Sequence, residues 1–374
     1  MKKSVLLVAF STLMVLLAAM TFRGNDELPY NLKMGTPEVK SISSLTFGPE
    51  GILFIGDSKS AAVYAVNTKD TKIPASVSPI NVQAIDQKIA ALLGTTVDNI
   101  SILDIAVNPV SKKLYLAIQS GDGTPVLMTL SEDKFSPVSL SNVEFAEVQL
   151  NNSPGVDEKD GRGRSLRVST ISDIEYTDGK LMVSGISNKE FSSTFRSIPF
   201  PFTNEQDYAS LEIFHAAHGR YETTSPIKAF TTGNVNGKLY LIASYTCTPL
   251  VLFPLDELKA GTHVKGRTIA EMGSGNQPLD LISMEKDGKS YLVMANSRHP
   301  VFQVDFKDIE SFEGSLTEPL ADNVKTEGVD FVSTPLTNVQ QLAKFDDNMM
   351  VFLQKKPNGS LDLWSTDKAE DLLK

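Results

Sequence analysis

Cysteine, tryptophan and histidine are scarce in this chain, whose 374 residues include one cysteine, one tryptophan and four histidines. The single cysteine, Cys247, excludes an intramolecular disulfide, haem attachment through a Cys-x-x-Cys-His motif, and zinc or iron–sulfur sites built from several cysteines. An exported protein without disulfides is more typical of bacteria than of a eukaryotic secretory route. The sequence also lacks a Gly-x-Ser-x-Gly motif, a phosphate-binding glycine loop and a dinucleotide fingerprint. No enzyme class is therefore indicated by a local motif.

Basic residues are outnumbered, with 35 Lys and Arg against 45 Asp and Glu and a net charge of −10. Phosphate binding requires a basic surface, so nucleic acid is not expected as a partner. Apolar residues make up 41% of the chain, which is ordinary for a globular protein and supplies a sizeable core.

A long hydrophobic run occurs only at the N-terminus, where Lys2 and Lys3 precede a nearly unbroken apolar stretch over residues 5–20. This pattern predicts a signal peptide over residues 1–20, followed by a linker over residues 21–37. The run is shorter than the roughly 20 apolar residues that a spanning helix needs. We therefore expect a periplasmic or extracellular protein with no membrane span after signal cleavage. An uncleaved N-terminal anchor is the alternative, because the cleavage site is imperfect.

A repeated unit organises the rest of the chain and first occurs over residues 41–67 as SISSLTFGPEGILFIGDSKSAAVYAVN. It contains three short apolar segments with period-two alternation and β-branched residues, separated by Gly- and Pro-rich turns. This is the pattern of β-strands. Related units follow as SILDIAVNPVSKKLYLAI, TISDIEYTDGKLMVSGI, VNGKLYLI, PLDLISMEKDGKSYLVMA and NVQQLAKFDDNMMVFLQ.

These repeats predict an all-β fold, a six-bladed β-propeller over residues 38–366 with a C-terminal tail over residues 367–374. The turns before the second strand of each unit are 51 to 67 residues apart, which exceeds the roughly 40 to 50 residues of common propeller repeats. The excess indicates insertions. Seven blades remain an alternative if residues 134–160, which contain VEFAEVQL, form a degenerate blade.

A short inserted helix is expected over residues 81–94, with Asn81 as its cap and Gly94 at its end. Its apolar residues share one face; they are Ile85, Ile89, Leu92 and Leu93.

Two further insertions predict loops, a polar one over residues 151–168 and a phenylalanine-rich one over residues 188–208. The sixth unit has three predicted strands where a blade needs four. Its outer strand is expected from a short strand near Val39, at residues 38–40. A ring closed by both ends of the chain leaves no open sheet edge.

The segments GPEGILFIGDSKSAAVYAV and YTDGKLMVSGI resemble blades of the NHL, SMP-30/gluconolactonase and strictosidine-synthase-like propellers, in which an Asp/Glu-Gly-x-Leu-x-Val pattern follows a short inner strand. The resemblance holds at the level of single blades over most of residues 41–366. It implies the propeller fold. Because this architecture serves many functions, the resemblance implies no particular activity.

In propellers of this type, the loops from second to third strand and from blade to blade gather on one face around a central channel. Such loops often carry binding sites. An aspartate recurs on the innermost strand of three units, as Asp104, Asp173 and Asp280, whereas Ser44 and Gln341 take this place in the first and sixth units.

Carboxylates around a channel repel one another and need a cation, a proton or an arginine partner. One interpretation of Asp104, Asp173 and Asp280 is a Ca²⁺ site with oxygen ligands. The resemblance to SMP-30-like enzymes implies such an ion at this level of the channel, although Ser44 stands near the place of their first-blade glutamate. The other interpretation is that each aspartate accepts backbone N–H groups of a neighbouring blade.

Basic residues are also predicted on the channel face. Arginine side chains on loops bind carboxylate or phosphate groups, so these residues form the candidate ligand-binding set. Its members are Arg162, Arg164, Arg167, Arg196, Arg298 and His299. Alternatively, the arginines pair with the aspartates or with the nearby acids Asp157, Glu158 and Asp160.

His215 and His218 form a His-x-x-His pair, but residues three apart on a strand point to opposite faces. Without a converging ligand set, we interpret them as ordinary structural histidines. Cys247 could act as a nucleophile only beside a base, and we interpret it as a small buried apolar residue.

No catalytic set is assembled by these patterns. We therefore expect an exported, monomeric, non-catalytic propeller that binds an unidentified ligand or protein partner on its channel face, with Ca²⁺ as the one candidate cofactor. The first alternative is a metal-dependent hydrolase of the SMP-30 or lactonase type, with Ca²⁺ held by the three aspartates. The second is a structural or surface-assembly protein that uses the aromatic segment 191–202.

Overall fold

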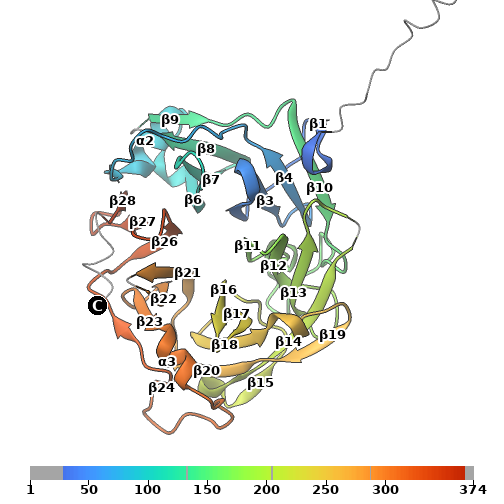
Figure 1. Cartoon of the computed structure of the whole chain (residues 1–374), viewed down its shortest axis with the longest axis vertical. Helices are drawn as coiled ribbons and strands as arrows, with labels where there is room; N and C mark the ends of the chain where they lie inside the picture. The colour runs from blue at the N-terminus through green and yellow to red at the C-terminus, as the bar shows by residue number, and fades with distance from the viewer. Residues whose placement is uncertain (1–27, 132–133, 204, 287, 367–374) are drawn as a thin grey trace, which may run out of the picture.

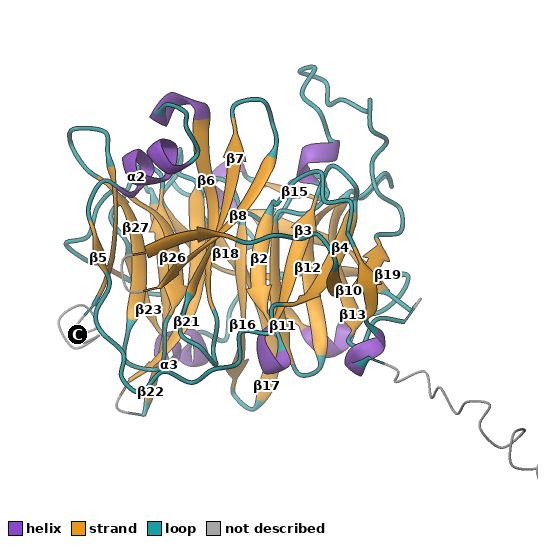
Figure 2. Cartoon of the chain, turned by 90° about the horizontal axis from the view of Figure 1, so that it is seen from above, coloured by secondary structure: helices purple, strands orange, loops and turns teal. Residues whose placement is uncertain are grey.

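The computed structural model describes residues 28–131, 134–203, 205–286 and 288–366. The predicted signal peptide and C-terminal tail lie outside these residues. Six antiparallel sheets, one of them with an added parallel strand, stand around a common axis, which confirms the six-bladed β-propeller (Figure 1). Seen from the side, the strands run between two rims of loops and short helices (Figure 2). Every helix in the described part of the chain is too short or too polar to cross a bilayer.

The strands of the first three blades are given from the channel outwards. Blade one contains β2 (Ser44–Phe47), β3 (Ile52–Asp57), β4 (Ala62–Asn67), β10 (Val143–Gln149) and β1 (Lys33–Gly35). Blade two contains β6 (Ile100–Val107), β7 (Leu114–Ser120), β8 (Pro125–Ser131) and β9 (Lys134–Pro137). Blade three contains β11 (Asp173–Thr177), β12 (Lys180–Ile186), β13 (Ser193–Pro199), β14 (Asp207–His215) and β15 (Arg220–Glu222), with β19 (Thr262–Lys265) parallel to β14.

The other three blades follow the same plan. Blade four contains β16 (Ala229–Val235), β17 (Lys238–Ser244), β18 (Pro249–Pro254), β20 (Arg267–Met272) and β24 (Thr326–Gly328). Blade five contains β21 (Pro278–Lys286), β22 (Lys289–Asn296), β23 (Phe302–Asp305) and β25 (Val332–Ser333). Blade six contains β26 (Val339–Lys344), β27 (Met350–Lys355), β28 (Leu361–Ser365) and β5 (Asn81–Val82).

Helical segments connect some of these strands. The α-helices are α2 (Ile85–Leu92) and α3 (Phe306–Ser311). The short 3₁₀ turns are η1 (Pro29–Asn31), η2 (Pro49–Gly51), η3 (Val97–Asn99), η4 (Arg167–Ser169), η5 (Ala216–His218) and η6 (Leu255–Glu257).

The order of the blades around the ring differs from their order in the chain. The innermost strand β2 lies between β6 and β11, and β26 lies between β21 and β6. The ring therefore runs blade two, one, three, four, five, six, and blade six closes it against blade two (Figure 1). The chain steps from blade one to blade two, then returns past blade one and continues in the other direction.

Two outer strands are exchanged between blades at this point. After β4 the chain places β5 beside β28 in blade six, and after β9 it returns to place β10 beside β4 in blade one. The VEFAEVQL segment is thus the fourth strand of blade one, and the seven-blade alternative is wrong. The expectation for the outer strand of blade six is also wrong, because β5 supplies it, whereas residues 38–40 form no strand.

The inserted helix is confirmed as α2, but it begins later than expected. Asn81 lies in β5, and Ala84 occupies the cap position in a left-handed conformation with φ 50°. Leu92 is 52% exposed and so does not belong to the buried face. Gly94 follows the helix with φ +67°, as its cap role predicts.

The loop expected over residues 188–208 is a strand for much of its length, because it contains all of β13 and the start of β14. The prolines misled the prediction: Pro199 ends β13 rather than interrupting it, and a terminal proline breaks no ladder bond. Phe195 is 1% exposed and Phe200 packs edge-on against Phe54 at 4.9 Å. Residues 151–168 do form a loop, as expected.

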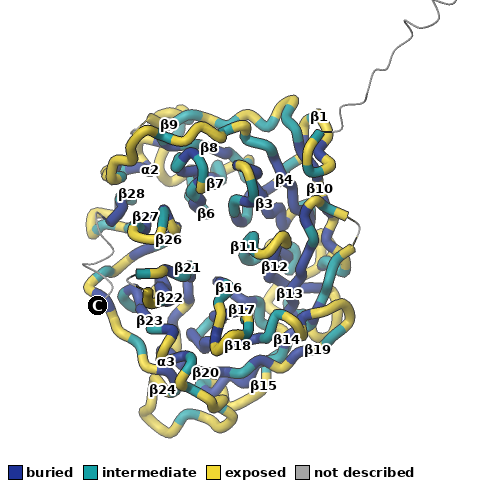
Figure 3. Tube along the Cα trace, viewed as in Figure 1, coloured by how far each residue is buried: buried dark blue, intermediate teal, exposed yellow. Residues whose placement is uncertain are grey.

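The core lies between the blades, where each sheet buries its faces against its two neighbours. Figure 3 shows the middle strands of the blades as buried and the outer turns as exposed. Between blades one and three, Phe54 stacks on Tyr176 with ring centroids 5.4 Å apart. Burying one large apolar side chain contributes roughly 1.5–3 kcal/mol, so these contacts fix the angle between neighbouring sheets.

Val82→Asp should destabilise the closure of the ring at blade six. Val82 is 1% exposed and pairs with Leu363, so a carboxylate there would be buried without a partner. The free energy of unfolding should fall by about 3 kcal/mol or more. Chemical unfolding followed by the fluorescence of Trp364, the single tryptophan, measures this loss because Trp364 pairs with β5.

Asn81→Asp is the matched control, since it adds the same charge to the same strand at an exposed position. Equal destabilisation by the two substitutions would contradict the role assigned to β5.

Candidate functional site in the channel

The three predicted aspartates lie on alternate blades around the channel. Asp104 on β6, Asp173 on β11 and Asp280 on β21 belong to blades two, three and five. In ring order they alternate with uncharged residues at the matching place, which are Ser44, Ala229 and Gln341. No two of these aspartates are on adjacent blades, which limits the repulsion between them.

Each aspartate accepts a backbone hydrogen bond from the next blade. Leu45 N donates to Asp104 Oδ2 at 2.6 Å, Phe230 N to Asp173 Oδ2 at 3.0 Å, and Leu342 N to Asp280 Oδ2 at 2.7 Å. The second oxygen of each carboxyl accepts the N–H of the following residue in its own strand at 2.8 Å. The innermost strand of every blade is an edge strand, so the N–H groups that point away from its own sheet need such acceptors. These are the bonds that the second interpretation of the aspartates predicted.

Ser44 joins the two aspartates on either side of it. Its hydroxyl lies 3.1 Å from Asp104 Oδ2 and 3.3 Å from Asp173 Oδ1, and it can donate to one of them at a time. The serine that stands in place of a glutamate thus connects blades two, one and three.

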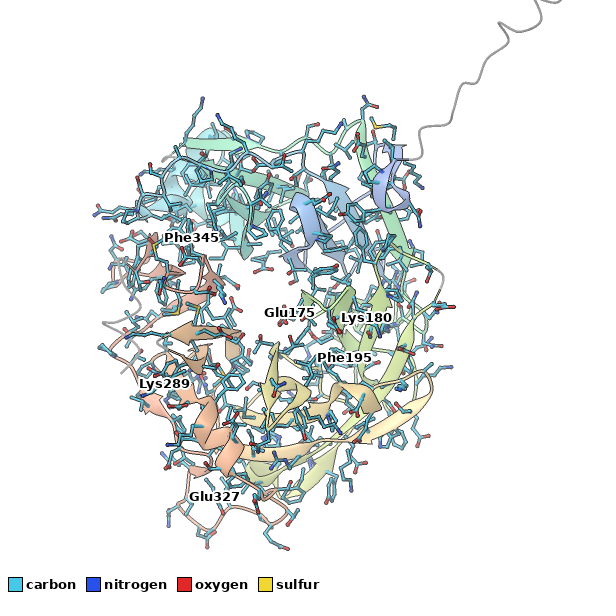
Figure 4. The ribbon with its side chains drawn as sticks, viewed as in Figure 1. Glu175, Lys180, Phe195, Lys289, Glu327 and Phe345 are labelled. Carbon is cyan, nitrogen blue, oxygen red and sulfur yellow. The ribbon has the colours of Figure 1, made fainter. Side chains whose placement is uncertain are left out.

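A fourth carboxyl group, Glu175, was missed from the sequence. It lies two residues after Asp173 on β11 and therefore on the same face of the strand. Its Oε2 accepts the backbone N–H of Thr232 at 3.1 Å, and its Oε1 accepts the Thr232 hydroxyl. Figure 4 shows Glu175 at the inner edge of the ring. The Asp-x-Glu spacing was the signal that could have identified it.

The four carboxyl groups line one cavity of about 330 Å³ in the channel. Its other lining residues are mostly apolar, with Thr231 and Ser283 among the polar ones. The described residues that line it include one cation, Lys344, and this side chain pairs with Asp347 at 2.8 Å. The carboxyl groups therefore face each other without a basic partner.

This environment favours the protonated form of the carboxyl groups. Burial raises the pKa of Asp104 to about 6, and burial together with the charge of Asp104 raises the pKa of Asp280 to about 7. The pKa of Asp173 is raised well above its usual value by burial and by repulsion from Asp280 and Asp104. Burial also raises the pKa of Glu175 to about 7. Near neutral pH the cluster therefore holds protons that exposed carboxyl groups would have released.

The aspartates do not form a compact ligand set. Among the described residues, Asp104, Asp173 and Asp280 do not bring three carboxylate oxygens within 4.8 Å of one another. Ca²⁺ takes six to eight oxygen ligands, and the oxygens here already accept backbone bonds. The assignment of these residues to Ca²⁺ stays a prediction.

The arginines of the candidate ligand-binding set lie outside this cavity. Arg196 is on β13, fully buried, with Nη2 donating to Asn151 O at 3.1 Å, and burial lowers its pKa to about 10. Arg164 pairs with Asp160 at 2.7 Å, as the alternative interpretation predicted, and Arg162 is exposed in the same loop.

Of the remaining members of that set, Arg167 lies at the end of the same insertion, in η4, and Arg298 and His299 lie in the loop after β22. Arg167 donates from Nη1 to Pro154 O at 2.7 Å. Arg298 is exposed after β22, and the adjacent His299 stacks on Phe302 with centroids 5.6 Å apart. Their role in ligand binding stays a prediction.

The free energy of unfolding should fall as the pH rises from about 4 to about 7. The folded protein holds protons on Asp280 and its neighbours that the unfolded chain has released in this interval, so a rise in pH favours unfolding. The side chain introduced by Asp280→Asn cannot ionise, so the contribution of this group to the decline is absent in the variant. Between about pH 4 and about pH 8, the free energy of unfolding of Asp280→Asn should therefore rise by about 2–4 kcal/mol relative to that of the wild type, at about 1.4 kcal/mol per pKa unit.

Urea unfolding at the two pH values measures the difference. Asp122→Asn is the control, because hydrogen bonds from Thr124 lower the pKa of this exposed carboxyl and its small effect should have the opposite sign. If the free energies of unfolding of the wild type and Asp280→Asn changed equally with pH, the prediction that the cluster is protonated would be contradicted.

No protein-family model and no curated protein sequence matches the chain. Solved structures of similar fold include a glucose dehydrogenase-type oxidoreductase from Thermus thermophilus, with TM-score 0.37 and 10% identity over 90% of this chain and 100% of that one. They also include a PQQ-bound aldose sugar dehydrogenase from Streptomyces coelicolor, with TM-score 0.36 and 13% identity over 90% and 98% of the chains. Virginiamycin B lyase from Staphylococcus aureus has TM-score 0.40 and 10% identity over 90% and 98%. These similarities extend to no activity.

Proposed function

We propose that the protein is an exported, non-catalytic binding propeller whose channel takes a small cationic ligand, such as a protonated amine. The observation that carries this proposal is the cavity of about 330 Å³ with four carboxyl groups and one lysine that already has a partner. Export rests on the signal-peptide pattern of residues 1–20.

The charge of the lining residues suits a cation. Burial, and after it repulsion from Asp280 and Asp104, raises the pKa of Asp173, and a bound cation would relieve that repulsion in place of protons. The volume lies at the lower end of the range for small-molecule sites, about 300–1,000 Å³. Apolar lining residues such as Phe47 and Ile282 can contact the hydrocarbon part of an organic amine.

The resemblance of single blades to NHL and SMP-30-type propellers is compatible with a ligand in the channel. The hydrolase alternative has less support, because among the described residues Asp104, Asp173 and Asp280 do not bring three carboxylate oxygens within 4.8 Å of one another. The surface-assembly alternative is weakened by the burial of Phe195 and Phe200, although Phe191 is 40% exposed.

Calorimetric titration with 1,4-diaminobutane tests the proposal. The wild type should bind it more tightly at about pH 8 than at about pH 5, because protonation of Asp104, Asp280 and Glu175 removes the attracting charge. Asp280→Asn or Glu175→Gln should weaken binding roughly tenfold or more, since a charge-assisted hydrogen bond contributes about 1.5–3 kcal/mol.

Asp122→Asn, which removes an exposed carboxylate outside the cavity, should leave diamine binding unchanged. Binding of citrate in place of the diamine would contradict the proposal and favour the arginine set.

The Ca²⁺ alternative has its own test. Millimolar Ca²⁺ should leave the melting temperature of the wild type unchanged, as in Asp173→Asn, because the three aspartates of the described chain do not gather three carboxylate oxygens within 4.8 Å of one another. A Ca²⁺-dependent rise in melting temperature that Asp173→Asn abolishes would overturn this expectation and support the hydrolase.

A further inference from the structure

A second cluster of functional side chains lies where blades three and four meet. His215 ends β14 and His218 ends the 3₁₀ turn η5. Residues three apart eclipse each other in a 3₁₀ turn, whereas they point to opposite faces in a strand. The two imidazole rings therefore lie close together, tilted by 40° to each other, with centroids 3.8 Å apart. The structural interpretation of this pair assumed a strand and so missed the convergence.

Glu222 on β15 fixes the orientation of both imidazoles. Its Oε1 lies 2.8 Å from His218 Nδ1 and its Oε2 lies 3.2 Å from His215 Nδ1. An imidazole that donates its Nδ1–H to this carboxylate presents the lone pair of Nε2 on the other side of the ring. Histidines that bind metals are commonly held by a carboxylate in this way.

Cys247 reaches the histidines from blade four, in the turn between β17 and β18. Cys247 and Thr248 both have left-handed backbones, with φ 69° and φ 60°, which is uncommon for non-glycine residues. The Cys247 N–H donates to Asn276 O at 2.7 Å and anchors this conformation. As a result, one ligand atom each of His215, His218 and Cys247 lies within 4.8 Å of the other two.

Buried polar atoms beside the cluster are left without partners. His215 is 1% exposed, and among the described residues its Nε2 has no hydrogen-bond partner. Glu271 on β20 is also 1% exposed, and its Oε2 is unpartnered. Glu271 Oε1 lies 3.9 Å from His215 Nε2, beyond hydrogen-bond distance. An unpaired buried polar atom costs about 1–3 kcal/mol, and a metal ion bound at Nε2 would remove this cost.

We propose that His215, His218 and Cys247 bind a transition-metal ion, Zn²⁺ by preference, and that this ion links blade three to blade four. Two imidazole nitrogens and a thiolate suit Zn²⁺ and do not suit Ca²⁺ or Mg²⁺. With Zn–N near 2.0 Å and Zn–S near 2.3 Å, tetrahedral ligand atoms stand roughly 3.3–3.6 Å apart. Side-chain rotations that close the three ligand atoms by about 1 Å complete the site. Glu222 acts as a positioning residue, and Glu271 is the nearest further carboxylate.

The test uses the mature chain without a polyhistidine tag, stripped of metal with a chelator and titrated with Zn²⁺ alone. The wild type should bind one Zn²⁺ per chain, and its melting temperature should rise with Zn²⁺ concentration. Cys247→Ser and His218→Ala should each weaken binding at least tenfold. His218 is 39% exposed, so its removal should leave the metal-free fold intact, as the fluorescence of Trp364 reports.

His263→Ala is the matched control, since His263 also pairs with a glutamate, Glu212, on the outer part of blade three. This variant should bind Zn²⁺ like the wild type. Co²⁺ provides a second measurement that does not depend on stability: the wild type should show a thiolate-to-cobalt charge-transfer band that Cys247→Ser loses. The proposal would be overturned if the wild type did not bind stoichiometric Zn²⁺, or if Cys247→Ser and His218→Ala bound Zn²⁺ with the affinity of the wild type.

Discussion

The main constraint on this propeller is that the N–H groups on the free edges of its innermost strands need hydrogen-bond acceptors. Every blade ends at the channel in an edge strand, and buried backbone donors that stay unpaired are costly. Asp104, Asp173 and Asp280 supply acceptors at three of the six junctions, and Ser44 lies between two of them. The same groups that hold neighbouring blades together are therefore the groups that give the cavity its acidity. The fold and the proposed ligand preference therefore depend on one set of carboxyl oxygens.

The order of the blades explains why this set is regular. In chain order the matching residues of the six units read Ser, Asp, Asp, Ala, Asp, Gln, which shows no pattern. In ring order, acids and uncharged residues alternate. Alternation gives each carboxylate a neighbouring blade whose N–H is free to donate, and it keeps the charges apart by one blade.

The sequence-based prediction succeeded where the information is local. Period-two apolar segments and turn residues identified the innermost, second and third strands of most units, and hence the six blades. The prediction failed where an element depends on a distant partner. Nothing in residues 81–82 or 143–149 indicates that they complete blades six and one, because their partners, β28 and β4, are remote in the sequence. The proline at the end of β13 led to the prediction of a loop where a strand is present. The 3₁₀ geometry at His218 could not be inferred from the His-x-x-His spacing alone.

The candidate channel site could be predicted only in part from the sequence, because some of its features also depend on distant segments. The recurring aspartates were visible as a motif, and their hydrogen-bonded role was one of two interpretations. Glu175 required knowledge of which face of β11 meets the channel, and the separation of the arginines from the cavity required the complete ring.

The exchange of β5 has a consequence for how the molecule matures. This short segment is made early, but the strand that receives it, β28, lies some 280 residues later in the chain. During synthesis from the N-terminus onward, β5 therefore has no partner strand until β28 has been made. Closure of the circle then requires the C-terminal strand, and a protein truncated anywhere before residue 361 would leave residues 81–82 without the strand they pair with.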